Sequence, residues 1–277
     1  MGVNDMSDKS LVVCSGGALS ASGARNLKSV ESANALLNLR EKISQNTALV
    51  SDEWLDRLIK WADEKNLLSQ KSEFMLFKYS FFRLPEWKFE PFYREYFPRD
   101  KDELRKCNGL SFQWCNFDDL PDEFGNLAEL EFLYIGEINK IPSSILRLKK
   151  LKVLGLNNYF ANEKTEISLS KEFARLSNLE FLTLDSHYFK HFPSAILELN
   201  KLRGLSLRGC GLSTLPERFA CLQNLQTLFL SRNDFKEFPQ VIFGLKNLKE
   251  LSIDKHLITP KIDKKLQEMG VNVSSHW

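Results

Sequence analysis

Apolar residues recur in one fixed order between Cys107 and Pro260. Counted from the first residue of a copy, apolar side chains stand at offsets 0, 3, 5, 10 and 13, with proline at offset 14. The copies that begin at Leu202 and Leu225 show this order most completely. The spacing fits neither one amphipathic helix nor one long alternating strand. It predicts a coil that turns once per copy and directs its apolar side chains inward.

Seven copies can be counted over residues 107–259. They begin at Cys107, Leu130, Leu151, Leu179, Leu202, Leu225 and Leu248. The second copy lacks two residues between Ile135 and Pro142, and the third has five extra residues between Leu156 and Ser170. Ser170 replaces the proline of that third copy. Because the register survives these changes, we expect one continuous stack of coils.

The order of residues in each copy resembles the leucine-rich repeat family, in the variant with the consensus LxxLxLxxNxLxxLPxxIxxLxx. The resemblance covers a little over half of the chain. It implies an α/β repeat solenoid with a curved, parallel, concave β-sheet, and the repeats look most like those of bacterial leucine-rich repeat and effector-like proteins. Some effectors of this kind add a C-terminal ubiquitin-ligase domain. We expect none here, because 17 residues follow Pro260.

Each position in a copy has a physical reason. Leu228 and Leu230 alternate with Phe229, which is the period of a short strand with one buried face. The next slot, at offset 8, holds Asn233, whose side chain can bond to neighbouring backbone where the chain leaves the strand. Cysteine or histidine fills the same slot in other copies: Cys115, His187, Cys210 and His256. Proline then fits the turn that follows, where no ladder N–H is needed.

The segments outside the repeats differ from them in composition and in the spacing of apolar residues. Residues 1–50 begin with a Ser- and Gly-rich stretch that predicts a disordered tail, with a pattern that allows a helix over 26–43. Residues 51–106 predict a helical and aromatic N-terminal cap, in which 84–106 keeps the spacing of a degenerate repeat. An aromatic recognition surface is the alternative for this segment. Residues 260–277 predict a C-terminal cap of one helix and one edge strand.

Composition narrows the class of protein. A net charge of +2 gives no strong field for nucleic acid, and no apolar run approaches the length of a membrane helix. The five cysteines form no CxxC pair, so we expect free thiols in a reducing, cytoplasmic compartment. No histidine has metal-ligand spacing, and no nucleotide-binding or nucleophile motif occurs. We therefore expect no catalytic residue, metal or cofactor.

Function should then lie on the exposed residues of the sheet. Offsets 2, 4, 6 and 7 of each copy are expected to face the concavity, and aromatic and arginine residues there are typical of binding hot spots. The alternative is that these aromatic residues pack on one another or under the N-terminal segment. The predicted partner-binding residues are Trp114, Phe132, Tyr134, Val153, Asn157, Phe181, Asp185, Arg208, Phe229 and Arg232.

These observations predict a non-enzymatic module that binds a protein partner through the concave face. In one version it is a bacterial effector that enters a host cell, with the Ser-rich tail as its secretion signal. One alternative is a sensor of a small ligand or peptide in the area of Trp114, Tyr134 and Phe181. Another is an enzyme with its active site in residues 1–106. The insertion at 157–170 is a second candidate recognition element, or an inert loop.

Overall fold

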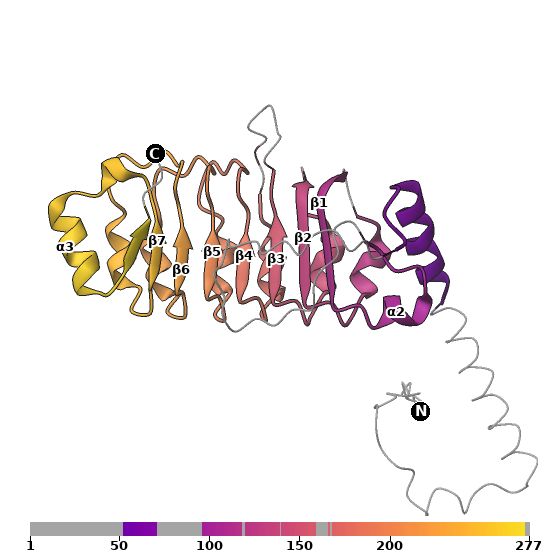
Figure 1. Ribbon diagram of the computed structural model, residues 1–277. Coiled ribbons are helices and arrows are strands. Elements are labelled where there is room, and N and C mark those ends of the chain that lie inside the picture. Colours follow the sequence, from indigo (N-terminus) through magenta and orange to yellow (C-terminus); the bar gives the residue numbers. More distant parts are fainter. Residues whose placement is uncertain are drawn as a thin grey trace, which may run out of the picture. The chain divides into compact units, whose positions relative to one another are not determined.

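One eight-stranded parallel sheet organises the protein (Figure 1). The computed structural model describes residues 52–70, 96–117, 120–138, 140–158, 166 and 168–274. Neighbours in the sheet are neighbours in sequence, from β1 to β8. The strands are β1 (Gly109–Phe117), β2 (Phe132–Ile138), β3 (Val153–Leu156), β4 (Phe181–Thr183), β5 (Gly204–Ser206), β6 (Thr227–Phe229), β7 (Glu250–Ser252) and β8 (Asn272–Ser274).

A short 3-10 helix follows each of the first six strands and brings the chain back to the start of the next coil. Each of these helices begins directly after the residue that fills the proline position of its copy, which is proline in five copies and Ser170 in the third. Proline has no N–H and a fixed φ, which suits this position. The helices are η2 (Asp122–Asn126), η3 (Ser143–Arg147), η4 (Lys171–Arg175), η5 (Ser194–Glu198), η6 (Glu217–Cys221) and η7 (Gln240–Gly244).

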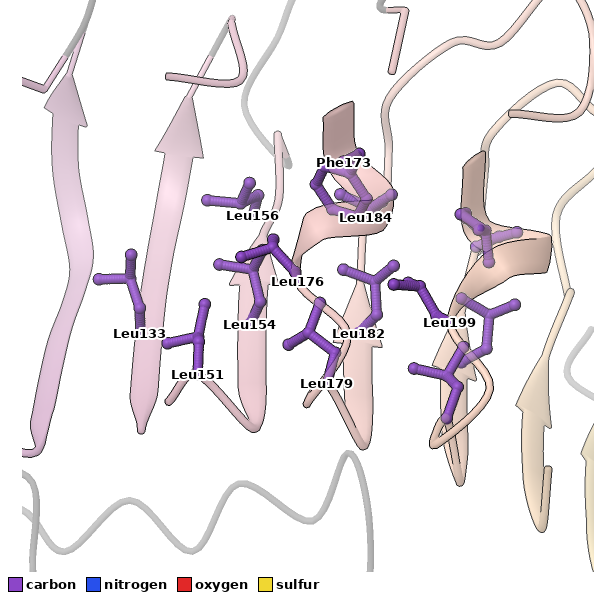
Figure 2. Packing of buried hydrophobic residues seen from close by; sticks show 14 of the residues in the cluster. Leu133, Leu151, Leu154, Leu156, Phe173, Leu176, Leu179, Leu182, Leu184 and Leu199 are labelled. Atoms are coloured by element: carbon purple, nitrogen blue, oxygen red, sulfur yellow. The ribbon is translucent and has the colours of Figure 1, made fainter. Parts of the chain in front are cut away.

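The core is a continuous stack of leucine and phenylalanine side chains between the sheet and the 3-10 helices. Figure 2 shows leucines of β3 and β4 meeting Phe173 and Leu176 of the η4 turn. Leu154, Leu182 and Phe173 are almost completely buried. Burial of one such side chain is worth about 1.5–3 kcal/mol, and every coil adds several. The stack therefore stabilises each coil through its two neighbours.

An N-terminal helix over 52–64 covers the first coil. Its Leu55, Leu58 and Ala62 are buried in the core cluster. Trp61 lies between four phenylalanine rings, with centroid distances of 5.3–6.3 Å to Phe97, Phe112, Phe117 and Phe124. The helix is followed by a bridge between Leu68 and Tyr96 and by α2 (Lys101–Arg105).

The last coil is closed by α3 (Pro260–Glu268) and β8. Thr259 caps α3 by accepting a hydrogen bond from the Ile262 N–H, and Pro260 occupies the first helical turn. Gly270 has a φ of +73°, the left-handed conformation that ends helices. Leu266 and Val271 are buried beneath this end. A short 3-10 turn, η8 (Lys255–Leu257), connects β7 to α3.

The structure confirms the predicted α/β solenoid, with its parallel sheet, N-terminal cap and C-terminal cap. Several predictions fall outside the described residues: the disordered tail, the helix over 26–43, and most of the aromatic segment and degenerate repeat at 84–106. Of that degenerate repeat, Phe97 and Pro98 are described, and both are buried.

Candidate functional site on the sheet face

The face of the sheet away from the leucine core is made of two rows of side chains in exact register. Offset 2 places Phe132, Val153 and Phe181 next to one another on β2, β3 and β4. Offset 4 places Tyr134, Gly155 and Thr183 side by side on the same strands. Because parallel strands lie about 4.8 Å apart, side chains in one row can contact each other.

The first row is apolar at its N-terminal end. Phe132 and Val153 are partly exposed, whereas Phe181 is only 1% exposed. The Arg203 guanidinium carbon lies 5.8 Å from the Phe181 ring centroid, and the strand partner of Phe181 is Gly204, which has no side chain to compete for space. The prediction that Phe181 is exposed is therefore wrong, while Phe132 and Val153 form an accessible apolar spot.

Tyr134 lies flat along the sheet. An added Cβ at Gly155 would stand 2.3 Å from the Tyr134 ring, so the ring rests directly on β3. The Tyr134 hydroxyl accepts a hydrogen bond of 2.8 Å from the Asn157 side-chain amide. This contact holds the ring in place, and Tyr134 presents one partly exposed face.

A ladder of polar groups continues across the next strands. The Asn157 side-chain oxygen accepts hydrogen bonds from the Thr183 hydroxyl and the Asp185 N–H, each 2.9 Å long. Asp185 repeats the arrangement one coil later, where one carboxylate oxygen accepts from the Ser206 hydroxyl at 2.6 Å and the Arg208 N–H at 2.9 Å. Asn157 and Asp185 are each 0% exposed. The prediction of exposed side chains is wrong for both, because they bond across coils.

Two arginines follow at the C-terminal part of the face. The Arg208 guanidinium carbon lies 4.2 Å from the centroid of the Phe229 ring, a cation–π contact. Phe229 is 7% exposed, which corrects the prediction that it is open to a partner. Arg208 remains partly exposed, and Arg232 in the next coil is exposed. Trp114 lies in β1, but its side chain is outside the described part of the structure.

The side chains at offset 8 contact backbone carbonyl groups of the preceding coil and so connect neighbouring coils. The Asn233 amide donates to the Leu207 carbonyl at 2.7 Å, the Cys210 thiol donates to the Leu184 carbonyl at 3.2 Å, and His187 Nε2 lies 3.1 Å from the Leu156 oxygen. Each acceptor is the offset-5 leucine of the preceding coil. The structure confirms that Cys210 and His187 stand in for asparagine here, whereas His256 Nε2 lies 3.4 Å from the carbonyl oxygen of Phe235, at offset 10 of the preceding copy.

Burial sets the protonation of these slot residues. Desolvation lowers the pKa of His187 to about 4, so the buried ring is neutral at neutral pH and its Nε2–H donates to the Leu156 carbonyl. Desolvation, and then the nearby Asp185 charge, raise the pKa of the Cys210 thiol. Both groups are therefore uncharged parts of the scaffold rather than reactive groups.

Two β-bridges join the described residues of the third copy's insertion to neighbouring coils. Asn158 forms an antiparallel bridge with Glu137, and Glu166 forms a parallel bridge with Tyr188. Residues 159–165 lie outside the described residues. The insertion therefore leaves and rejoins the stack beside the strand ends of the sheet, and its role as a recognition element stays a prediction.

Two adjoining hollows lie away from the sheet face. One of about 570 Å³ is lined by residues including Phe192, Thr214 and Arg218, and one of about 530 Å³ by residues including Thr214, Phe235 and Phe238. Neither reaches Tyr134 or Phe181, the area of the predicted small-ligand alternative.

Within the described ranges, no group of three or more His, Cys, Asp or Glu residues is arranged to hold a metal ion. No helix in those same ranges has the length and apolarity to cross a bilayer.

One family model matches the C-terminal repeats of this chain. The family described as leucine-rich repeat region matches residues 190–271. The TMV resistance protein N of Nicotiana glutinosa is 30% identical over 141 residues, which are 41% of this chain and 12% of that protein. The chain thus matches only a small part of the length of this curated relative.

Among solved structures, a leucine-rich repeat protein of Leptospira interrogans is 28% identical, with a TM-score of 0.49, and the match covers 62% of this chain and 50% of that one. The leucine-rich repeat domain of the type III effector XopL is 19% identical, with a TM-score of 0.46, and that match covers 66% of this chain and 74% of the other.

Proposed function

We propose that this chain, in which residues 190–271 match the leucine-rich repeat region family, binds a protein partner through the exposed face of its sheet. Stacked repeats of this kind present a broad and rigid surface, and such surfaces commonly serve interaction rather than catalysis. The observation that carries the proposal is the mixture of accessible aromatic, aliphatic and arginine side chains in register on one face. Phe132, Tyr134 and Val153 supply its apolar part, and Arg208 and Arg232 its charged part.

The buried members of the predicted set act beneath this surface. Asn157 and Asp185 fix Tyr134 and the backbone of Arg208, while Phe229 supports the Arg208 guanidinium. A preorganised surface loses less side-chain entropy when a partner binds, which favours affinity. In the proposal these residues therefore position the contact residues, and the accessible side chains meet the partner.

Two double variants test the proposal, one on the sheet face and one on the 3-10 helix η4. Phe132→Ala with Val153→Ala removes the accessible apolar spot, and Lys171→Ala with Arg175→Ala changes exposed residues of η4. Wild type would be used to capture and identify a partner from cytosol, and dissociation constants would then be measured. We expect the sheet variant to weaken binding at least tenfold, about 1.4 kcal/mol, and the η4 variant to leave it unchanged. The reverse order would refute the proposal.

The cellular setting belongs to the proposal as well. We place the protein in a cytoplasm, either of its own cell or, in the effector version, of a host cell. The support is the cysteine usage: Cys107, Cys115, Cys210 and Cys221 are all free thiols, as a reducing compartment maintains them. A fusion of residues 1–50 to a translocation reporter tests the effector version, which requires that this segment carry the reporter into host cells.

A further inference from the structure

Two arginines of the sheet face stand beside each other in consecutive coils. Arg208 is at offset 6 of the fifth copy, and Arg232 is at offset 7 of the sixth. The backbone oxygen of Arg232 lies 3.9 Å from the position that a Cβ would take on Gly209, the residue after Arg208. Arg208 rests on the Phe229 ring at 4.2 Å, which holds its planar guanidinium over the strand. The backbones at Arg208 and Arg232 thus lie side by side in neighbouring coils.

The backbone at Arg232 is in a conformation that arginine rarely adopts. Offset 7 is left-handed in three consecutive copies, with φ values of +64° at Ser186, +64° at Gly209 and +62° at Arg232. Gly209 shows that glycine serves this turn, and glycine alone adopts this conformation without steric cost. Among the described residues, the Arg232 guanidinium has no ion pair or hydrogen bond that would offset the cost. The turn itself therefore gives no reason for an arginine.

The carboxylates near this pair are already bonded to N–H and O–H groups of the coils. Both oxygens of Asp254 accept from the Arg232 N–H, at 2.9 and 3.0 Å. Asp185 accepts from Ser206 and from the Arg208 N–H. These acidic groups are used to hold backbone, whereas the Arg232 side chain is exposed. The exposed Arg232 guanidinium therefore offers N–H donors that no group of the described coils uses.

We infer that Arg208 and Arg232 bind carboxylate side chains of an acidic protein segment, while Phe132 and Val153 receive its apolar residues. The inference rests on the proposed function and adds the chemistry of the partner. Arginine binds carboxylates through paired N–H groups, which gives both affinity and orientation. A protein segment is chosen over nucleic acid because the net charge is +2 and two arginines do not form the long basic track that a phosphate backbone requires.

A displayed library of random short peptides, selected on the full wild-type chain, tests this inference. We expect the selected peptides to be enriched in Asp and Glu. Arg232→Gly and Arg208→Gln should each weaken their binding about tenfold, because each removes charge-assisted hydrogen bonds. Arg175→Ala, which removes a positive charge from η4, should leave binding unchanged. Arg232→Gly should melt at the same or a higher temperature than wild type, and Arg232→Gln repeats the loss of charge without glycine.

Other outcomes separate this inference from the function on which it rests. Peptides that lose affinity with Phe132→Ala but not with Arg232→Gly would overturn the inference and leave the sheet-face function standing. Peptides indifferent to both substitutions would overturn both. An oligonucleotide or phosphopeptide that displaces a selected acidic peptide more strongly than a glutamate-rich peptide does would also overturn the carboxylate assignment.

Discussion

Asn233, Cys210 and His187 occupy one position in three consecutive coils, and each bonds to the carbonyl of the offset-5 leucine in the coil before. The three side chains differ in size and chemistry but share one hydrogen-bond donor in the required place. The spacing of the sequence predicts which residues share this slot. It does not predict which donor reaches which carbonyl, because that depends on how far each coil is rotated on the next.

The buried His187 makes stability depend on pH. Its pKa is about 4 in the folded chain and 6.5 in an unfolded one, so protonation favours unfolding. The contribution of His187 is fully present above pH 6.5 and is lost as the pH falls toward 4, by about 3 kcal/mol in total. We expect His187→Asn to remove this part of the pH dependence in urea unfolding. His191→Asn, at an exposed position, should unfold with the wild-type pH profile, and identical profiles for all three proteins would contradict the assignment.

Asn233 bonds to four backbone groups through its side chain. Besides two carbonyls at 2.7 and 2.8 Å, it bonds to the N–H groups of Cys210 and Leu212 at 3.1 and 3.0 Å. Asn233→Ala would leave these backbone groups without partners, at a cost of about 2–4 kcal/mol. Asn224→Ala is the matched control, since Asn224 is exposed and donates to the Asn200 carbonyl. Equal loss of stability in both variants would show that the hydrogen bonds at offset 8 contribute no more than an exposed one.

At the scale of elements, the cap and the first coils depend on one aromatic cluster. Trp61 of the N-terminal helix contacts phenylalanines that come from the loop before α2, from β1 and from η2. The ion pair between Arg57 and Glu123, at 2.5 Å, joins the same two parts at the surface. Such exposed pairs contribute little, so the aromatic contacts should dominate.

Trp61→Ala should therefore destabilise the protein by about 3 kcal/mol, the lower end of the range for a large core aromatic residue, because Trp61 is partly buried. Because each coil contacts only its neighbours, amide exchange should accelerate most in β1 and β2 and least in β6 and β7. Lys60→Ala, one residue earlier on the exposed face of the same helix, should exchange like wild type. Uniform acceleration across all strands in the Trp61 variant would mean that the solenoid unfolds as a single unit.

The elements also show where sequence reasoning stops. The repeat spacing is sufficient to predict every strand from β1 to β7 and the turn after each proline. The exposure of single side chains on the sheet face is a different matter. Tyr134 lies across Gly155, and Asn157 and Asp185 are drawn inward by groups of the neighbouring coil. Alternation along one strand contains no information on such contacts, which form between residues 21 to 28 positions apart.

At the scale of the whole molecule, the sheet offers one face with an apolar spot and an arginine pair. These parts come from coils separated by many residues, and only the stacking of the repeats brings them onto a common surface. Substitutions of single exposed residues leave this stacking intact. They therefore separate effects on partner binding from effects on stability. Affinity and melting temperature should respond to different substitutions.

Site-specific cross-linking tests the central claim, binding through the sheet face, most directly. A photoreactive benzoylphenylalanine would replace Phe132 on the sheet or Ala174 on η4, in otherwise identical full-length chains. With the captured partner present, the account predicts a cross-linked product from position 132 and none from position 174. A product from position 174 alone would contradict the account, because the partner would then sit on the 3-10 helices and not on the sheet.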